Sequence, residues 1–108
     1  MRYILASKLI LLPNTTEVSR PLPVVGFNTA QIDVVMFHAQ SLTVKLEQSN
    51  DGENWRALNE WACGSDMAYS LLSETRDVAS ALVRVRWTAA ENNSGPMMVA
   101  SGINLTNT

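Results

Sequence analysis

The chain has little of several residue types on which catalysis and covalent cross-linking depend. Among its 108 residues there is one histidine, His38, and one cysteine, Cys63. A single cysteine excludes an internal disulfide and a cysteine-based zinc site. A catalytic nucleophile needs a neighbouring base, and no motif brings Cys63 and His38 together. The sequence therefore predicts no enzyme, no catalytic residue, no cofactor and no metal site of this kind.

These two residues and one acidic turn have simpler interpretations. His38 lies in the most apolar segment, where we expect a satisfied core or interface histidine rather than a ligand or base. We expect Cys63 to be a buried free thiol. A calcium site formed by Asn50, Asp51 and Glu53 is a minor alternative, because hard cations take oxygen ligands from turns. Their spacing matches no dedicated calcium loop.

Charge is also scarce, and lysine most of all. Charged residues make up 17% of the chain, against about 25% in typical domains. There are two lysines against six arginines, five methionines and three tryptophans. Protein interfaces are depleted of lysine and enriched in these other types. This composition is explained either by chance in a short chain or by obligate assembly with other subunits. The net charge of −2 argues against nucleic-acid binding, which requires a basic face.

No apolar run is long enough to span a bilayer. Ile4–Leu12 is interrupted by Ser7 and Lys8 and lacks a small-residue cleavage site. We therefore predict no membrane association and no secretion by a signal peptide.

The clearest positive signal is a β-hairpin. In the segment 42–48 apolar residues alternate with polar ones, which is the pattern of a strand buried on one face. Asp51 and Gly52 then form a strong turn signal, because both tolerate positive φ. Trp55 begins a returning segment that extends to Trp61.

Other short segments indicate further strands. Ala81–Ala89 places Val83, Val85 and Trp87 on one face, and Ile32–Ala39 is a nearly continuous apolar run. No segment has a capped helical pattern of comparable length. We predict an all-β fold, a single antiparallel β-sandwich or jelly roll of about seven to eight strands over residues 1–108. Residues 1–30 would form an N-terminal strand and an extended arm, and residues 31–108 the main sandwich.

Two short motifs support this fold. Ser49, Asp51, Gly52 and Trp55 form a Ser-x-Asp-Gly-x-x-Trp sequence at a strand end, and Arg84-Val85-Arg86 lies in a later strand. Over residues 42 to 89 the chain resembles galactose-binding-like jelly rolls of the discoidin type. The resemblance implies that the turn closes a hairpin, that the tryptophan fills the core and that the arginine braces a neighbouring strand. The predicted turn and core residues are Ser49, Asp51, Gly52, Trp55, Arg84 and Trp87. The terminal cysteines and apolar loop tips of discoidin domains are absent, so the resemblance concerns the fold.

The same motifs in a compact chain also resemble small β-sandwich accessory proteins of tailed bacteriophage virions. This resemblance implies a non-enzymatic virion structural protein, made in the host cytoplasm, and most of all a capsid decoration or cement protein. Its partners would be the major capsid protein or another virion protein, and further copies of itself in a homo-oligomer. The alternative is a carbohydrate-binding module of galactose-binding-like fold. A solvent-facing Trp61 beside a groove would favour that alternative, whereas Trp61 at a subunit contact would favour the first.

The sequence also suggests where a partner would bind. Proline cannot donate to a central ladder, so Pro21 and Pro23 predict an edge strand or an arm that reaches a neighbour. Met97 and Met98 must point to opposite faces of the last strand, and methionine adapts to irregular partner surfaces. The predicted interface residues are Pro21, Pro23, Phe27, Met36, Trp61, Met97 and Met98.

Overall fold

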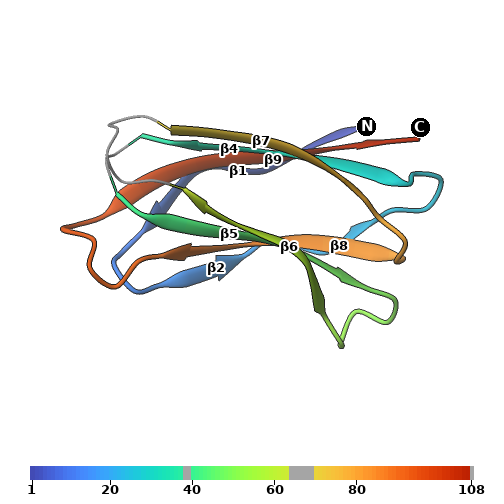
Figure 1. Ribbon diagram of the computed structural model, residues 1–108, viewed down its shortest axis with the longest axis horizontal. Coiled ribbons are helices and arrows are strands. Elements are labelled where there is room, and N and C mark those ends of the chain that lie inside the picture. Colours follow the sequence, from blue (N-terminus) through green and yellow to red (C-terminus); the bar gives the residue numbers. More distant parts are fainter. Residues whose placement is uncertain (38–39, 64–69, 108) are drawn as a thin grey trace.

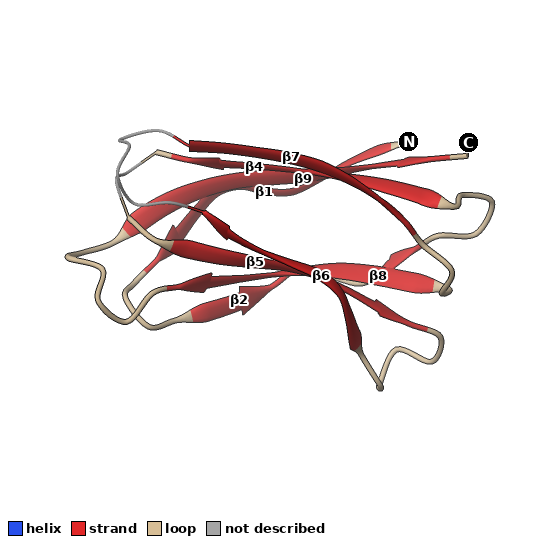
Figure 2. Ribbon diagram, viewed as in Figure 1, coloured by secondary structure: helices blue, strands red, loops and turns tan. Residues whose placement is uncertain are grey.

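The computed structural model is a sandwich of two antiparallel β-sheets, and it describes residues 1–37, 40–63 and 70–107 (Figure 1). The described residues form strands and loops only (Figure 2). Their strands are β1 (Arg2–Leu11), β2 (Thr16–Val18), β3 (Leu22–Pro23), β4 (Thr29–Met36), β5 (Leu42–Ser49), β6 (Arg56–Cys63), β7 (Ser70–Asp77), β8 (Leu82–Ala89) and β9 (Met97–Thr106). The prediction of an all-β sandwich is confirmed, with nine strands in place of seven or eight. His38 lies outside the described residues.

The strand order is that of a ribbon rolled on itself. The four-stranded sheet has the order β1-β9-β4-β7, and the five-stranded sheet has the order β2-β8-β5-β6 with β3 also on β8. The hairpin β5–β6 is innermost, and the pairs β4–β7, β2–β8 and β1–β9 are nested successively around it. Rolling this ribbon brings β9 against β4 and β8 against β5, which yields the two layers of a jelly-roll-like sandwich.

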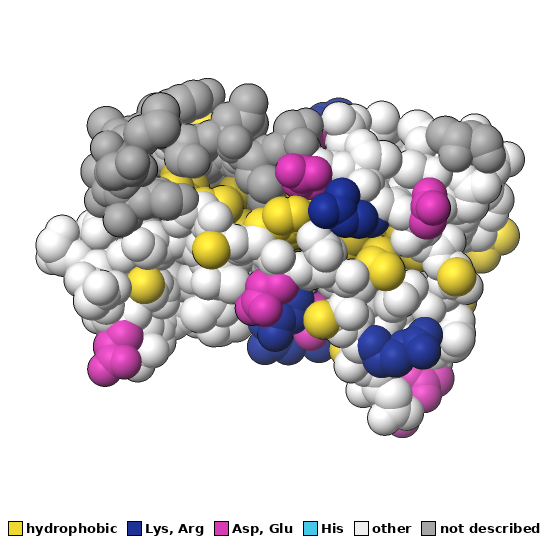
Figure 3. Space-filling view, in the orientation of Figure 1, with side chains coloured by type: hydrophobic (Ala, Val, Ile, Leu, Met, Phe, Trp, Pro, Cys, Tyr) yellow, Lys and Arg dark blue, Asp and Glu magenta, His cyan; other side chains and the backbone are white. Residues whose placement is uncertain are grey.

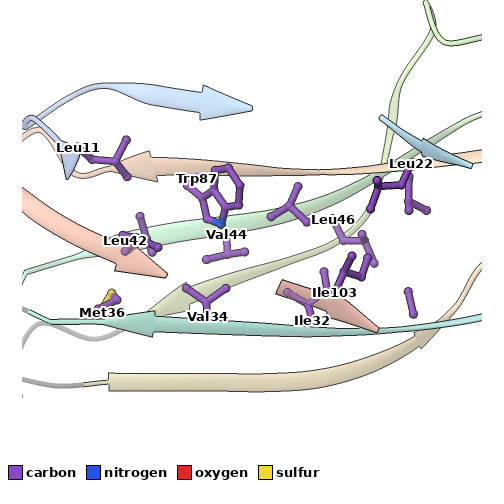
Figure 4. Packing of buried hydrophobic residues seen from close by; sticks show 14 of the residues in the cluster. Leu11, Leu22, Ile32, Val34, Met36, Leu42, Val44, Leu46, Trp87 and Ile103 are labelled. Atoms are coloured by element: carbon purple, nitrogen blue, oxygen red, sulfur yellow. The ribbon is translucent and has the colours of Figure 1, made fainter. Parts of the chain in front are cut away.

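The core lies between the two sheets and follows the two-residue period of the strands. Alternate residues of β4, β5, β8 and β9 are buried, and Trp87 projects from β8 between the layers beside Val44 (Figure 4). Complete burial of a large aliphatic side chain contributes about 1.5–3 kcal/mol. The largest fully buried side chains are Leu11, Ile32, Met36, Leu42, Leu46, Met97, Ile103, Leu105, Val34, Val44, Val83 and Val85.

The segment predicted to be a free arm is instead the edge of the five-stranded sheet. β2 and β3 both pair with β8, and Ser19 between them exchanges hydrogen bonds with Val85: its backbone N–H donates to Val85 O at 2.8 Å, and its Oγ accepts from Val85 N at 2.9 Å. Leu22 and Val24 are 3% exposed. Pro21 and Pro23 only interrupt the edge strand. Burial of Leu22 and Val24 keeps the segment packed on the sandwich of its own chain. The arm prediction for residues 1–30 is therefore wrong, and the edge-strand alternative is confirmed.

Candidate functional site on the outer face of the four-stranded sheet

The hairpin tip between β5 and β6 is held by its own side chains. Ser49 Oγ accepts hydrogen bonds from the backbone N–H groups of Asp51 at 3.2 Å and Gly52 at 3.0 Å. Asp51 Oδ1 accepts from the N–H groups of Glu53 and Asn54, both at 2.9 Å, and Trp55 Nε1 donates to Gly52 O at 3.1 Å. The Ser-x-Asp-Gly-x-x-Trp motif is thus a closed turn network, as predicted.

This network also bears on the calcium alternative. The backbone N–H groups of Asn54 and Glu53 and the side chains of Asn54 and Ser49 hold the pKa of Asp51 well below its usual range. Both carboxylate oxygens of Asp51 already accept donors from the loop, and Arg56 lines the same shallow hollow. An oxygen-ligated cation would have to displace these donors and approach a guanidinium, so the tip is a poor calcium site. Within residues 1–37, 40–63 and 70–107, no three His, Cys, Asp or Glu side chains gather as a metal-binding group.

Replacing Gly52 with valine should lower the free energy of unfolding by about 1–3 kcal/mol. Gly52 has φ of +79°, which a β-branched residue adopts only with strain. An added Cβ would be in ordinary contact with Leu82 Cδ1, at 3.5 Å, so the cost arises from the backbone. Urea denaturation measures the loss.

Gly95→Val is the matched control for Gly52→Val. Gly95 is not among the positive-φ residues, and nothing lies within 4 Å of an added Cβ. Its substitution should change stability by only a few tenths of a kcal/mol, either way. Equal losses at both positions would contradict the assignment of the turn.

Arg84 and Arg86 of β8 hold a buried carboxylate on the outer face of the five-stranded sheet. Arg84 Nε lies 2.8 Å and Arg86 Nε 3.3 Å from Glu47 Oε1, and Glu47 is 7% exposed. Burial by itself raises the pKa of Glu47, but the hydrogen bond from Arg84 and the charges of Arg86 and Arg84 outweigh it, and the pKa lies below its usual value. Arg84 thus braces the neighbouring strand β5, as predicted.

The tryptophan of the motif is not in the core. The Trp55 ring packs on the Arg84 guanidinium, 4.1 Å from the ring centroid, and is only half-buried. The prediction that this tryptophan fills the core is wrong, and Trp87 fills it instead. Trp55 belongs to the turn that precedes β6, beyond the end of the core-facing side of the sheet, so its ring does not reach the core.

Trp61 closes the gap between the two sheets at the edge formed by β6 and β7. Its ring packs partly on the core, and Arg76 of β7 lies over it with Cζ 5.3 Å from the ring centroid. The Asn59 side-chain oxygen, in the amide orientation that satisfies both donors, accepts from Trp61 Nε1 at 3.1 Å and Arg76 Nη2 at 3.2 Å. Figure 3 shows apolar side chains along this seam, interrupted by charged ones. Trp61 is therefore occupied within the chain and does not form an open aromatic platform.

The other predicted interface residues divide into buried and accessible groups. Met36 and Met97 are 1% and 0% exposed and cannot reach a partner, so those two predictions are wrong. Met98 points outward, as alternation requires. Pro21 and Pro23 are exposed on the edge strand, and Phe27 packs partly against the core.

The outer face of the four-stranded sheet carries an apolar patch. Ile4 is 65% exposed, Ile10 56% and Phe37 40%, and Val35, Met98 and Ala100 are half-buried beside them. These six residues are called the apolar face below. Sheets with one face in water normally present polar residues there. A grouped apolar patch on a sheet instead marks an interaction surface.

The apolar face contains a shallow hollow above Gly102 of β9. The hollow has a volume of about 280 Å³, and its lining includes Ile4, Val35 and Ala100. At its rim Arg2 forms an ion pair with Asp33. The Arg2 guanidinium passes so close to Gly102 that an added Cβ would lie 2.6 Å from Arg2 Nη2. Because Gly102 has no side chain, the Arg2 guanidinium can pass over it and form the ion pair with Asp33 at the rim of the hollow.

The outer face of the five-stranded sheet has the opposite character. The register places Lys45 beside Glu60 and Arg86, and Thr43 beside Thr88. Lys45 Nζ lies 3.9 Å from Glu60 Oε1. Charged and hydroxyl groups thus cover this sheet, whereas the apolar face is bordered by the pair Arg2–Asp33 and by the exposed Lys8 of β1. The two outer surfaces therefore differ in polarity.

Cys63 should react slowly with thiol reagents in the folded protein. It is half-buried at the end of β6, and burial raises the pKa of its thiol above the usual value. The thiolate is the reactive form, so a raised pKa lowers its population near neutral pH. Iodoacetamide labelling of native and urea-unfolded protein, followed by mass spectrometry, should give a native rate at least about tenfold lower. Equal rates would contradict this expectation.

The described residues include no apolar helix of membrane-spanning length. No known family model matches the chain, and no curated protein matches it in sequence. Among solved structures, the fold is similar to the PBSX exported protein XepA, a phage protein, with a TM-score of 0.77 and 11% identity. That match covers 100% of this chain and 37% of the other, so the chain spans little more than a third of that protein's length.

Two further folds are less similar. The K3 cleaved adhesin domain of Lys-gingipain from Porphyromonas gingivalis w83 has a TM-score of 0.55 and 13% identity, over 90% of this chain and 73% of that chain. A family 29 carbohydrate binding module has a TM-score of 0.47 and 10% identity, over 99% of this chain and 89% of that chain. At these identities the likeness concerns the fold.

Sequence reasoning identified Met98 of the apolar face but missed Ile4 and Ile10. A signal for them exists in the first strand, where Tyr3, Ile4 and Leu5 are apolar in succession rather than in alternation. Such a run indicates a strand with apolar residues on both faces. It does not say which residue points outward, because β1 has register shifts between Ile4 and Ala6 and between Ala6 and Leu9.

Proposed function

We propose that this chain is a non-enzymatic structural component of a bacteriophage particle, specifically a capsid decoration protein that binds the head lattice. The apolar face carries the proposal. It is broad and shallow, which suits a protein surface better than a small molecule held in an enclosed pocket. Its residues Ile4, Ile10 and Phe37 are exposed in this chain, and a protein surface packed over them would remove them from water.

The similarity to a phage exported protein supports the same proposal. It extends over the entire chain, at a TM-score of 0.77. The similarity covers only 37% of that protein, so it supports a shared domain fold and not the activity of the whole protein. The scarcity of lysine, noted from composition, agrees with a chain whose surface is partly covered by other subunits.

The mechanism would be burial of apolar surface across subunit contacts. Each square ångström of apolar surface removed from water contributes about 25 cal/mol. A lattice repeats the contact many times, and linked contacts give strong overall binding even where each is weak. Decoration would then stabilise the shell without chemical change in either protein.

A carbohydrate-binding module has weaker support. That function would need an open aromatic surface, and the Trp61 ring is already covered in part by Arg76 and the core. The similarity to the carbohydrate binding module does not reach the level at which it distinguishes one sandwich from another.

Co-sedimentation with phage heads tests the proposal. Undecorated heads of the phage whose genome carries the gene are mixed with purified chain, pelleted and assayed for bound protein. We expect saturable binding and a higher temperature of head disruption in its presence. Chain that ignores heads but is retained on a polysaccharide column, with retention lost in Trp61→Ala, would overturn the proposal in favour of the carbohydrate module.

A further inference from the structure

The turn between β5 and β6 contains an Asp–Gly peptide bond in an exposed place. Asp51 and Gly52 are both exposed, and the turn projects from the body of the sandwich (Figure 1). Among aspartyl peptides, Asp–Gly is the most prone to spontaneous isomerisation, because glycine has no side chain that hinders attack by its backbone nitrogen. Sequence and exposure alone would therefore make Asp51 a site of covalent modification without any enzyme.

The reaction proceeds through a cyclic imide. The Gly52 nitrogen attacks Asp51 Cγ, a bond forms between these two atoms, and the hydroxyl of the protonated carboxyl group leaves with the amide proton as one water molecule. Addition of one water molecule then opens the ring. Cleavage of the new bond restores aspartate, whereas cleavage of the original peptide bond leaves isoaspartate, in which the main chain runs through Cγ. The carboxyl group must therefore be protonated and must turn toward the Gly52 nitrogen.

The turn opposes both requirements at the carboxylate. Asp51 Oδ1 accepts hydrogen bonds from the backbone N–H groups of Asn54 and Glu53 and from Ser49 Oγ, each at 2.9 Å. Asp51 Oδ2 accepts from Asn54 Nδ2 at 2.7 Å. These donors direct the carboxylate toward the residues after Gly52 and hold the pKa of Asp51 well below its usual range. Rotation toward the Gly52 nitrogen would break these hydrogen bonds.

The attacking nitrogen is held as well. The Gly52 N–H donates to Ser49 Oγ at 3.0 Å, and the Gly52 carbonyl accepts from Trp55 Nε1 at 3.1 Å. Ser49 is only 1% exposed, so its hydroxyl is itself fixed at the end of β5. One buried hydroxyl thus accepts from Gly52 and donates to Asp51, which ties both reacting groups to the sandwich.

We propose that Asp51–Gly52 is a latent isomerisation site, which the hydrogen bonds centred on Ser49 keep unreactive as long as the turn is closed. Reaction then requires local opening of the turn, so its rate in the folded protein scales with the open fraction. The product cannot restore the turn, because its lengthened main chain displaces the acceptor of the Glu53 and Asn54 N–H groups. Each opening therefore risks a change that closing does not reverse.

Incubation of the purified chain near neutral pH and at physiological temperature tests this proposal. Isoaspartate at position 51 is measured by peptide mass spectrometry and by methylation with a protein isoaspartyl methyltransferase. The folded chain should isomerise at least about a hundredfold more slowly than the same chain in guanidinium chloride. Ser49→Ala should raise the rate in the folded state at least about tenfold, because it removes hydrogen bonds to both reacting groups.

Ser94→Ala is the matched control for Ser49→Ala. Ser94 is an exposed serine of the loop between β8 and β9, where its Oγ accepts from Gln40 at 3.4 Å, and its substitution should leave the isomerisation rate unchanged. Circular dichroism establishes that each variant is folded. If Ser49→Ala loses the β-sheet spectrum, the exposed Asn54→Ala replaces it, with an expected rise of about threefold from loss of one side-chain donor.

Three results would overturn the proposal. They are equal rates in the folded and unfolded chain, no change in the folded variant of Ser49 or Asn54, and an equal rise in Ser94→Ala. Phage heads are not needed for this test, and its outcome does not depend on the proposed function.

Discussion

Replacing Trp87 with alanine is expected to lower the free energy of unfolding by about 3–5 kcal/mol. Trp87 is 2% exposed at the centre of the core, between the two sheets (Figure 4). Truncation removes its apolar contacts and leaves a cavity that rigid strands can only partly fill. Since domains of this size are stable by about 5–15 kcal/mol, much of the stability would be lost. Urea denaturation followed by circular dichroism gives the value.

Two further variants separate the causes of this loss. Trp55→Ala makes the same chemical change outside the core, where the ring packs on Arg84 and its N–H donates to Gly52 O, and should cost roughly 1 kcal/mol. Trp87→Phe keeps an aromatic ring and removes the indole N–H, which has no hydrogen-bond partner among the described residues. Removing this unpaired buried donor compensates in part for the lost packing volume, so Trp87→Phe should also lower the free energy of unfolding by roughly 1 kcal/mol. Equal losses for the two alanine variants would contradict the placement of Trp87 in the core.

Glu47→Gln should lower the free energy of unfolding by about 2 kcal/mol at pH 7. The change removes the charge that Arg84 and Arg86 share, and leaves two guanidinium groups facing a neutral amide. Loss of one partner from a fully buried ion pair costs about 3–5 kcal/mol, and partial exposure of the arginines reduces this value. Glu60→Gln is the control. Its pair with Lys45 is long and exposed, so it should change stability by less than about 0.5 kcal/mol.

The difference between wild type and Glu47→Gln should also depend on pH. The pKa of Glu47 is lowered in the folded protein, so the ionised carboxylate contributes its full stability above the ordinary pKa of 4.5. That contribution is lost as the pH falls through the lower folded-state pKa. The stabilities of the two proteins should therefore converge in acid. A difference that persists undiminished at pH 2 would show that shape, rather than charge, makes Glu47 important.

Local signals were sufficient for the strands and the hairpin. Leu42, Val44 and Leu46 alternate with polar residues, and all three are buried in the structure. Ser49, Asp51 and Gly52 form the predicted turn because their hydrogen bonds are made within a few residues of chain. Such features depend on neighbours in sequence, which a sequence shows directly.

Faces and partners of strands were predicted less well. Met97 and Met98 were correctly assigned to opposite faces, but the sequence did not show which one lies inside. Trp55 was placed in the core by resemblance and lies on the surface. Pro21 and Pro23 indicated an edge strand or an arm equally, and the burial of Leu22 and Val24 against the sandwich decided for the edge.

The sequence by itself determined an all-β chain with its hairpin turn, its inward alternation and its thin surface charge. Only the tertiary structure decided that Arg84 and Arg86 meet Glu47, that Arg76 covers Trp61, and that Ile4, Ile10 and Met98 lie on one face of the sheet. These groups join residues from strands that are distant in the chain. The pairing of β5 with β8 brings the first group together, the meeting of the two sheets at β6 and β7 the second, and the pairing of β1 with β9 the third. None of these is encoded in the spacing of residues within one strand.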